Sequence, residues 1–80
     1  MSDNLDKYKK AFKESLEITD DNILDKLKYN DIEQWDSIGH MGLISALEDS
    51  FKISIETNDV IDFSSFEKGK EILKKYNVDI

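Results

Sequence analysis

Hydrophobic and polar positions follow a helical period in two stretches of the chain. The apolar positions of the first stretch are Leu5, Tyr8, Phe12 and Leu16. Those of the second are Ile38, Met41, Ile44, Leu47 and Phe51, with Leu43 widening the stripe. Spacings of three and four residues place such positions on one face of a helix. We therefore predict amphipathic helices at about residues 3–17 and 37–51.

The remaining segments predict shorter elements. Residues 18–34 hold apolar side chains without a sustained period, which favours a long ordered loop with one or two helical turns, capped by Asp31 and packed onto the helices. Thr57 is the expected cap of a short helix that continues through Val60 and Ile61. Ser64 and Glu67 have the separation of a capping box, which would open a last helix reaching about Tyr76.

These elements predict an all-α fold, a small bundle of three main helices plus one short helix, within a single domain spanning 1–80. The long first connection allows the first two main helices to lie antiparallel. The apolar side chains expected in the core of the second helix are Met41, Leu43, Ile44 and Leu47. Those expected to be buried by the last helix are Phe66, Ile72, Leu73 and Tyr76.

Composition narrows the possible functions. The chain has no cysteine and one histidine, His40, which excludes disulfides and argues against a zinc site of the usual kind. No apolar run approaches the roughly 20 residues of a membrane span, and the N-terminus lacks the features of a signal peptide. A soluble cytoplasmic protein is therefore expected, and we take it to be a monomer.

Charge is unevenly distributed along the chain. The net charge is −7 overall, whereas residues 29–67 hold nine acidic residues and only one lysine, Lys52. A field of this sign repels nucleic acid and steers toward basic partners. The same charge is equally consistent with a simple role in solubility.

Candidate chemistry lies at the start of the second helix, in Trp35-Asp36-Ser37-Ile38. Either Asp36 or Ser37 can cap this helix with a side-chain oxygen. Trp35 either covers the end of the bundle or faces a partner. The sequence thus places a serine hydroxyl at the opening of an amphipathic helix, preceded by a carboxylate.

Asp36-Ser37-Ile38 resembles the Asp-Ser-Leu signature of the acyl carrier protein family. The resemblance extends to the order of the helices, the ALEDSFKISIE stretch (Ala46–Glu56) and the entry to the last helix at 63–66. It implies that Ser37 carries 4′-phosphopantetheine, transferred from coenzyme A by a magnesium-dependent phosphopantetheinyl transferase whose metal Asp36 helps to bind. The arm would hold acyl groups as thioesters, and the helix N-terminus would favour its phosphodiester.

The resemblance also implies partners, and it assigns catalysis to them, so that this chain is expected to have no catalytic residues and not to be an enzyme. Acyl-transferring or condensing enzymes with basic patches would dock on residues that include Ile38, Met41, Glu48 and Asp49. Fatty-acid-synthesis carriers usually have acidic residues just after the serine, whereas this chain has Gly39, His40 and Gly42. Two glycines there cost roughly 0.8–1.0 kcal/mol each relative to alanine. They indicate either close approach of a partner's backbone or a frayed first turn, and the missing acids favour a specialised pathway over bulk fatty acid biosynthesis.

Three alternatives remain open. The first is an aminoacyl or peptidyl carrier with the same prosthetic group. The second is an acidic helical interaction module without a prosthetic group, for which Ser37 is only a cap. The third is a small hydrolase that pairs Ser37 with His40, although the sequence has no third member of a triad and no glycine elbow.

Overall fold

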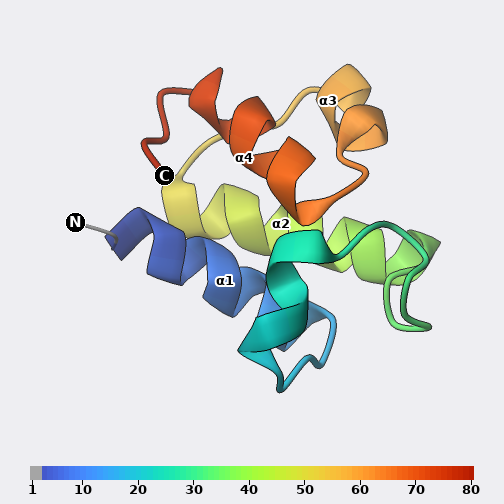
Figure 1. Ribbon diagram of the computed structural model, residues 1–80. Helices are drawn as coiled ribbons and strands as arrows, with labels where there is room; N and C mark the ends of the chain where they lie inside the picture. Colours follow the sequence, from blue (N-terminus) through green and yellow to red (C-terminus); the bar gives the residue numbers. More distant parts are fainter. Residues whose placement is uncertain (1–2) are drawn as a thin grey trace.

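The computed structural model describes residues 3–80, and they form an all-α bundle as predicted (Figure 1). The elements are α1 (Asp3–Ser15), the 3-10 helix η1 (Asp21–Lys26), α2 (Ser37–Phe51), α3 (Thr57–Asp62) and α4 (Phe66–Lys74). Within this part of the chain there is no strand, only an isolated antiparallel bridge between Lys28 and Ser65. None of the helices described is long and apolar enough to cross a membrane.

Helices α1 and α2 lie side by side and run in opposite directions, while α3 and α4 lie on the other side of the bundle (Figure 1). The Asn4 side-chain amide donates to the Asp79 carbonyl at 2.9 Å, which ties the first turn of α1 to the C-terminal segment. The antiparallel arrangement agrees with the expectation drawn from the long first connection.

Aromatic rings fill the centre of the bundle. The fully buried rings are those of Tyr8, Phe12, Trp35, Phe63 and Phe66. Phe12 makes edge-on contacts with Trp35 at 5.3 Å and with Phe66 at 4.9 Å between ring centroids. Such contacts add about 0.5–1.5 kcal/mol each to the burial of the rings. Trp35 therefore belongs to the core and does not face a partner.

The apolar stripe of α2 is only partly buried. Leu43, Ile44 and Leu47 are in the core, as predicted. Met41 was expected there too, but it is 58% exposed, and Ile38 is 83% exposed. The expectation for Met41 was wrong because its side chain lies on the side of α2 that borders an open pocket shared with α3.

The connection at 18–34 packs onto the helices as expected, with Leu24 and Leu27 buried. Its helical segment is η1, and the cap is Asp20, which accepts the Asn22 N–H at 2.9 Å. The predicted cap, Asp31, instead accepts the Lys28 N–H within a turn that follows η1. Asp31 lies C-terminal to η1, so it cannot cap that helix.

Two further caps differ from the predictions by one residue. Glu56 occupies the N-cap position of α3 without a side-chain hydrogen bond, and Thr57 is the first helical residue. Ser65, rather than Ser64, caps α4 by accepting the Lys68 N–H at 3.0 Å. The capping box of Ser64 with Glu67 is therefore wrong, because α4 begins one residue later than this box requires and the residue three positions after the cap is Lys68.

Three helices end without glycine. The residues just beyond α1, α2 and α4 that adopt positive φ are Glu17, Lys52 and Asn77. The N–H of the next residue then bonds back into each helix, as Ile53 does to Glu48 at 3.1 Å. This Schellman-type geometry satisfies carbonyls of the last turn. It ends α1 at Ser15 and α4 at Lys74, earlier than the predicted 17 and 76.

A charged cluster holds α3 against the end of α4. Asp59 is buried, and it accepts hydrogen bonds from the Lys75 ammonium at 2.6 Å and the Tyr76 hydroxyl at 2.5 Å. The bond from Lys75 contributes most to lowering the pKa of Asp59, followed by the bond from Tyr76. Tyr76 is only half-buried, since its hydroxyl reaches this polar cluster at the surface.

Candidate functional site

Ser37 is the first residue of α2 and is exposed. Asp36 precedes it in an extended conformation, and its Oδ1 accepts the Gly39 N–H at 2.9 Å. Of the two capping residues that the sequence allowed, the structure therefore has Asp36 as the cap. The Ser37 hydroxyl is left free of the helix backbone at the end where the helix dipole is positive.

The first turn of α2 has a loop folded tightly against it. A Cβ added at Gly39 would overlap the carbonyl oxygen of Gln34 and lie 3.2 Å from Leu16 Cδ2. A Cβ added at Gly42 would meet no atom within 4 Å. The close backbone approach expected at these glycines therefore occurs at Gly39, and the approaching backbone is that of the same chain.

His40 connects three parts of the site. The Trp35 indole N–H donates to His40 Nδ1 at 3.0 Å, and His40 Nε2 lies 2.8 Å from the Val60 carbonyl oxygen. An indole N–H can only donate, so Nδ1 is the acceptor and the ring proton is on Nε2, which donates to Val60. Both ring nitrogens are thus engaged, and the histidine links the start of α2 to α3.

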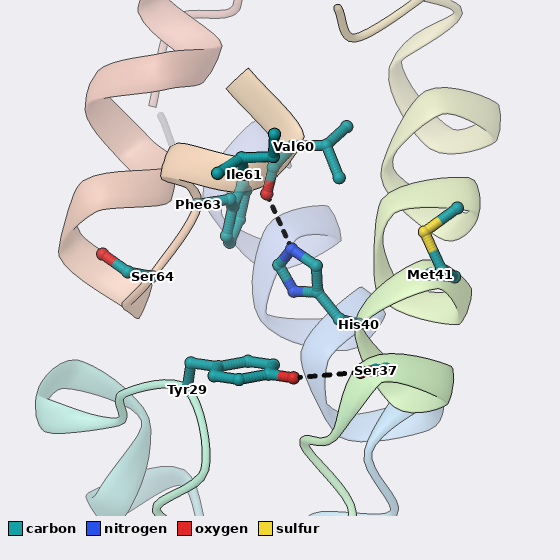
Figure 2. A pocket seen from close by; sticks show the side chains of 8 residues that line it. All are labelled: Tyr29, Ser37, His40, Met41, Val60, Ile61, Phe63 and Ser64. Atoms are coloured by element: carbon teal, nitrogen blue, oxygen red, sulfur yellow. Dashed lines mark hydrogen bonds between the residues drawn. The ribbon is translucent and has the colours of Figure 1, made fainter. Parts of the chain in front are cut away.

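A half-open pocket of about 350 Å³ lies beside Ser37 (Figure 2). The residues that line it are Tyr29, Ser37, His40, Met41, Val60, Ile61, Phe63 and Ser64. Its walls come from α2, from α3 and the turn after it, and from the loop that precedes α2. Ile61 at its rim is 72% exposed, so this mostly apolar cavity opens directly to solvent next to the serine hydroxyl.

Tyr29 is the residue whose side chain contacts the Ser37 hydroxyl. Its hydroxyl lies 3.3 Å from Ser37 Oγ, and either atom can be the donor. The isolated bridge positions it: the Tyr29 N–H donates to the Ser64 carbonyl at 2.9 Å, and the Phe66 N–H donates to the Leu27 carbonyl at 2.9 Å. The loop is therefore fastened to the entry of α4 on both sides of the bridge.

The predicted site residues fall into two groups. Asp36, Ser37, Ile38 and Met41 lie together at the start of α2, with Ser37 and Met41 in the pocket wall. Glu48 and Asp49 lie toward the other end, about 17–18 Å along the helix from Ser37 at 1.5 Å per residue. Asp49 is exposed, whereas Glu48 is partly buried and its Oε2 accepts the Ile55 N–H at 2.8 Å. Glu48 thus helps to fix the segment after α2.

Tyr29 and the α3 side of the pocket were not identified from the sequence. Tyr29 is brought to Ser37 by the pairing of Lys28 with Ser65, two residues that are distant in the chain. No local pattern encodes that pairing. His40 could have been anticipated as a partner of Trp35, since the two side chains are five residues apart and both are polar and aromatic.

No protein-family model matches this chain, and comparisons with curated proteins and with solved structures gave no match. The chemistry of the site is therefore argued from its residues and their geometry.

Proposed function

We propose that this chain is a carrier protein of the acyl carrier type, in which Ser37 bears 4′-phosphopantetheine. The observation that carries the proposal is the exposed Ser37 hydroxyl at the opening of α2, capped by Asp36 and bordering an apolar pocket. Attached there, the group would supply a thiol on a flexible arm, which a chain without cysteine lacks. A cargo tethered at one point reaches each partner at high effective concentration.

The residues around Ser37 fit a phosphate ester. The hydroxyl is exposed, and among residues 3–80 its only polar side-chain neighbour within hydrogen-bond distance is Tyr29. The unpaired N–H groups of the first turn lie beside it, a favourable place for an anion by about 0.3–1 kcal/mol. Asp36 Oδ1 accepts a hydrogen bond from the Gly39 N–H, so part of the negative charge of this carboxylate is balanced by the helix backbone.

In the loading step, the Ser37 Oγ–phosphorus bond forms as a phosphorus–oxygen bond of the coenzyme A pyrophosphate breaks. The hydroxyl proton passes to a base of the transferase, and adenosine 3′,5′-bisphosphate leaves. The Asp36 carboxylate, whose Oδ1 accepts the Gly39 N–H, would help to hold the transferase's magnesium, which would stabilise charge on the pyrophosphate. The carrier itself contributes the hydroxyl and its placement.

A specialised pathway fits this site better than bulk fatty acid biosynthesis. The first turn of α2 contains no acidic residue, so enzymes that dock on acids there would find no charge to engage. Exposed Ile38 and Met41 present an apolar contact instead. The cargo is an acyl group carried as a thioester, or alternatively an aminoacyl or peptidyl group.

A second candidate function is an acidic interaction module without a prosthetic group. The observation that favours it is the cluster of exposed apolar side chains at Ile38, Met41 and Ile61 within the acidic part of the chain. The hydrolase alternative has less support, because both nitrogens of His40 are occupied by Trp35 and Val60.

Intact mass spectrometry after incubation with coenzyme A, magnesium and a broad-specificity transferase tests the proposal. We expect a mass gain of one phosphopantetheine in the wild type and in Ser64→Ala, a matched change in the same pocket, and no gain in Ser37→Ala. No gain in the wild type, with an established carrier loaded in parallel, would overturn the carrier function. Binding of a basic partner that survives Ser37→Ala would then support the interaction module.

A further inference from the structure

We propose that Tyr29 is a binding residue for the prosthetic group and that its hydroxyl donates a hydrogen bond to the phosphodiester formed on Ser37. This inference rests on the proposed function and concerns how the chain holds the group once it is attached. It assigns a role to a residue outside the helix that carries the serine.

The position of Tyr29 is fixed by contacts that do not involve its hydroxyl. Its backbone N–H is bonded to Ser64, and its ring packs edge-on against Trp35 at 6.2 Å and His40 at 5.5 Å between centroids. Trp35 is itself fully buried and His40 is bonded at both nitrogens. The ring therefore rests on a rigid support and aims its hydroxyl across the mouth of the pocket toward Ser37 (Figure 2).

Loading of Ser37 would define the direction of this hydrogen bond. In the unmodified protein the two hydroxyl oxygens are 3.3 Å apart, longer than the usual 2.7–2.8 Å of an O–H···O bond. A phosphate ester removes the serine proton, so Tyr29 becomes the donor. The charged phosphate oxygens are also stronger acceptors than a serine hydroxyl, so we expect a shorter and stronger bond after loading.

No other side chain of the pocket is placed for this role. His40 already uses both nitrogens, and Ser64 lies on the α4 side of the pocket, away from Ser37 (Figure 2). The Tyr29 hydroxyl makes no hydrogen bond other than that to Ser37 among the described residues, and the residue is 37% exposed. Its donor is therefore available to a group on Ser37.

Phosphorus NMR of the loaded protein tests the inference. We expect the phosphodiester resonance to shift in loaded Tyr29→Phe relative to loaded wild type, and to stay unchanged in loaded Ser64→Ala. Tyr29→Phe keeps the ring contacts and the backbone bonds, so a purely structural role of the tyrosine would leave the resonance in place. The same resonance in Tyr29→Phe and wild type would overturn the inference.

A second measurement keeps the hydroxyl group of Tyr29 and uses fluorine NMR. The chain has three tyrosines, Tyr8, Tyr29 and Tyr76, and incorporation of 3-fluorotyrosine gives each a fluorine resonance. On loading, the Tyr29 resonance should move while those of Tyr8, which donates to the Phe66 carbonyl, and Tyr76 stay in place. A static Tyr29 resonance in fully loaded protein overturns this inference alone, whereas a wild type that gains no mass overturns the proposed function as well.

Discussion

At the scale of single residues, Gly39 and Gly42 lie one turn apart on α2 in opposite environments. Gly39 is covered by the Gln34 carbonyl, so the loop before α2 can lie against the helix only where a side chain is missing. Gly42 has open space around its Cα. The first glycine is therefore a requirement of the fold, whereas the second has no packing reason within the chain.

Alanine substitutions should change the stability of the protein in opposite directions at the two glycines. Gly42→Ala should stabilise the protein by about 0.8–1.0 kcal/mol, the difference in helix propensity between the two residues. Gly39→Ala should destabilise it, because its methyl group displaces a backbone carbonyl and the loop that holds Trp35. Urea unfolding of both variants measures the free energy of unfolding. Equal stabilisation by the two substitutions would show that the loop does not lie against α2.

The residues that could be predicted at the site are those defined by local chemistry. Asp36 and Ser37 lie within one turn of a helix start, where capping preferences act over three or four residues. The position of Tyr29 depends on the bridge between Lys28 and Ser65, and the exposure of Met41 depends on the pocket that α2 forms with α3. These are properties of the packed chain, so no local pattern reveals them.

At the scale of the elements, α3 is the part of the pocket wall that relies most on its neighbours. It has six residues, and isolated helices shorter than about 12–15 residues are marginal in water. Two attachments hold it: the His40 ring bonded to the Val60 carbonyl, and Asp59 bonded to Lys75 and Tyr76. The pocket beside Ser37 therefore keeps its shape through polar contacts on either side of α3.

The bounds of α2 were predicted correctly, from about Ser37 to Phe51, because an apolar stripe and a cap agree there. The ends of α1 and α4 were each predicted two residues too late. Beyond these two helices Glu17 and Asn77 adopt the left-handed conformation that usually marks a glycine, so the usual sequence signal for a helix end is missing. The capping errors at Thr57 and Ser64 have a similar origin, since several adjacent polar residues could each serve as a cap.

Acid titration of stability tests the attachment through Asp59. The hydrogen bonds from Lys75 and Tyr76 hold its pKa below the usual value, and the nearby positive charge of Lys68 acts in the same direction. The ionised carboxylate therefore stabilises the fold above the pKa of the unfolded chain, about 4. This stabilisation is lost as pH falls through the lower folded pKa.

We expect Asp59→Asn to lower the free energy of unfolding at pH 7 and to reduce the loss of stability on acidification below about pH 4. Asp49 is an exposed acid on α2, so Asp49→Asn is the matched control. It should leave the free energy of unfolding at pH 7 and its loss on acidification nearly unchanged. Urea unfolding at a series of pH values provides the measurement. If the free energy of unfolding fell as steeply with acidification in Asp59→Asn as in the wild type, Asp59 would not hold α3 against the end of α4.

At the scale of the whole molecule, charge is divided between two parts of the bundle. The acidic part, residues 29–67, includes α2, α3 and every residue that lines the pocket. The lysines lie mainly in α1 and in the C-terminal segment, where residues 68–80 carry a net charge of +2. An enzyme acting on Ser37, as the proposed function requires, would approach through the negative part of the molecule, and a basic surface would be steered toward it.

The salt dependence of the loading rate tests whether the acidic part of the molecule steers a transferase toward Ser37. We expect the kcat/KM of a transferase with a basic surface to fall as ionic strength rises, and Asp49→Lys to lower it at low salt. Glu14→Lys changes the net charge by the same amount on α1, where an exposed pair with Lys10 at 3.9 Å contributes little, and it should have the smaller effect. Near 1 M salt, where the screening length is about 3 Å, the three proteins should converge. If Glu14→Lys slowed loading as much as Asp49→Lys, net charge alone would govern the encounter, and the acidic end of α2 would have no part in docking.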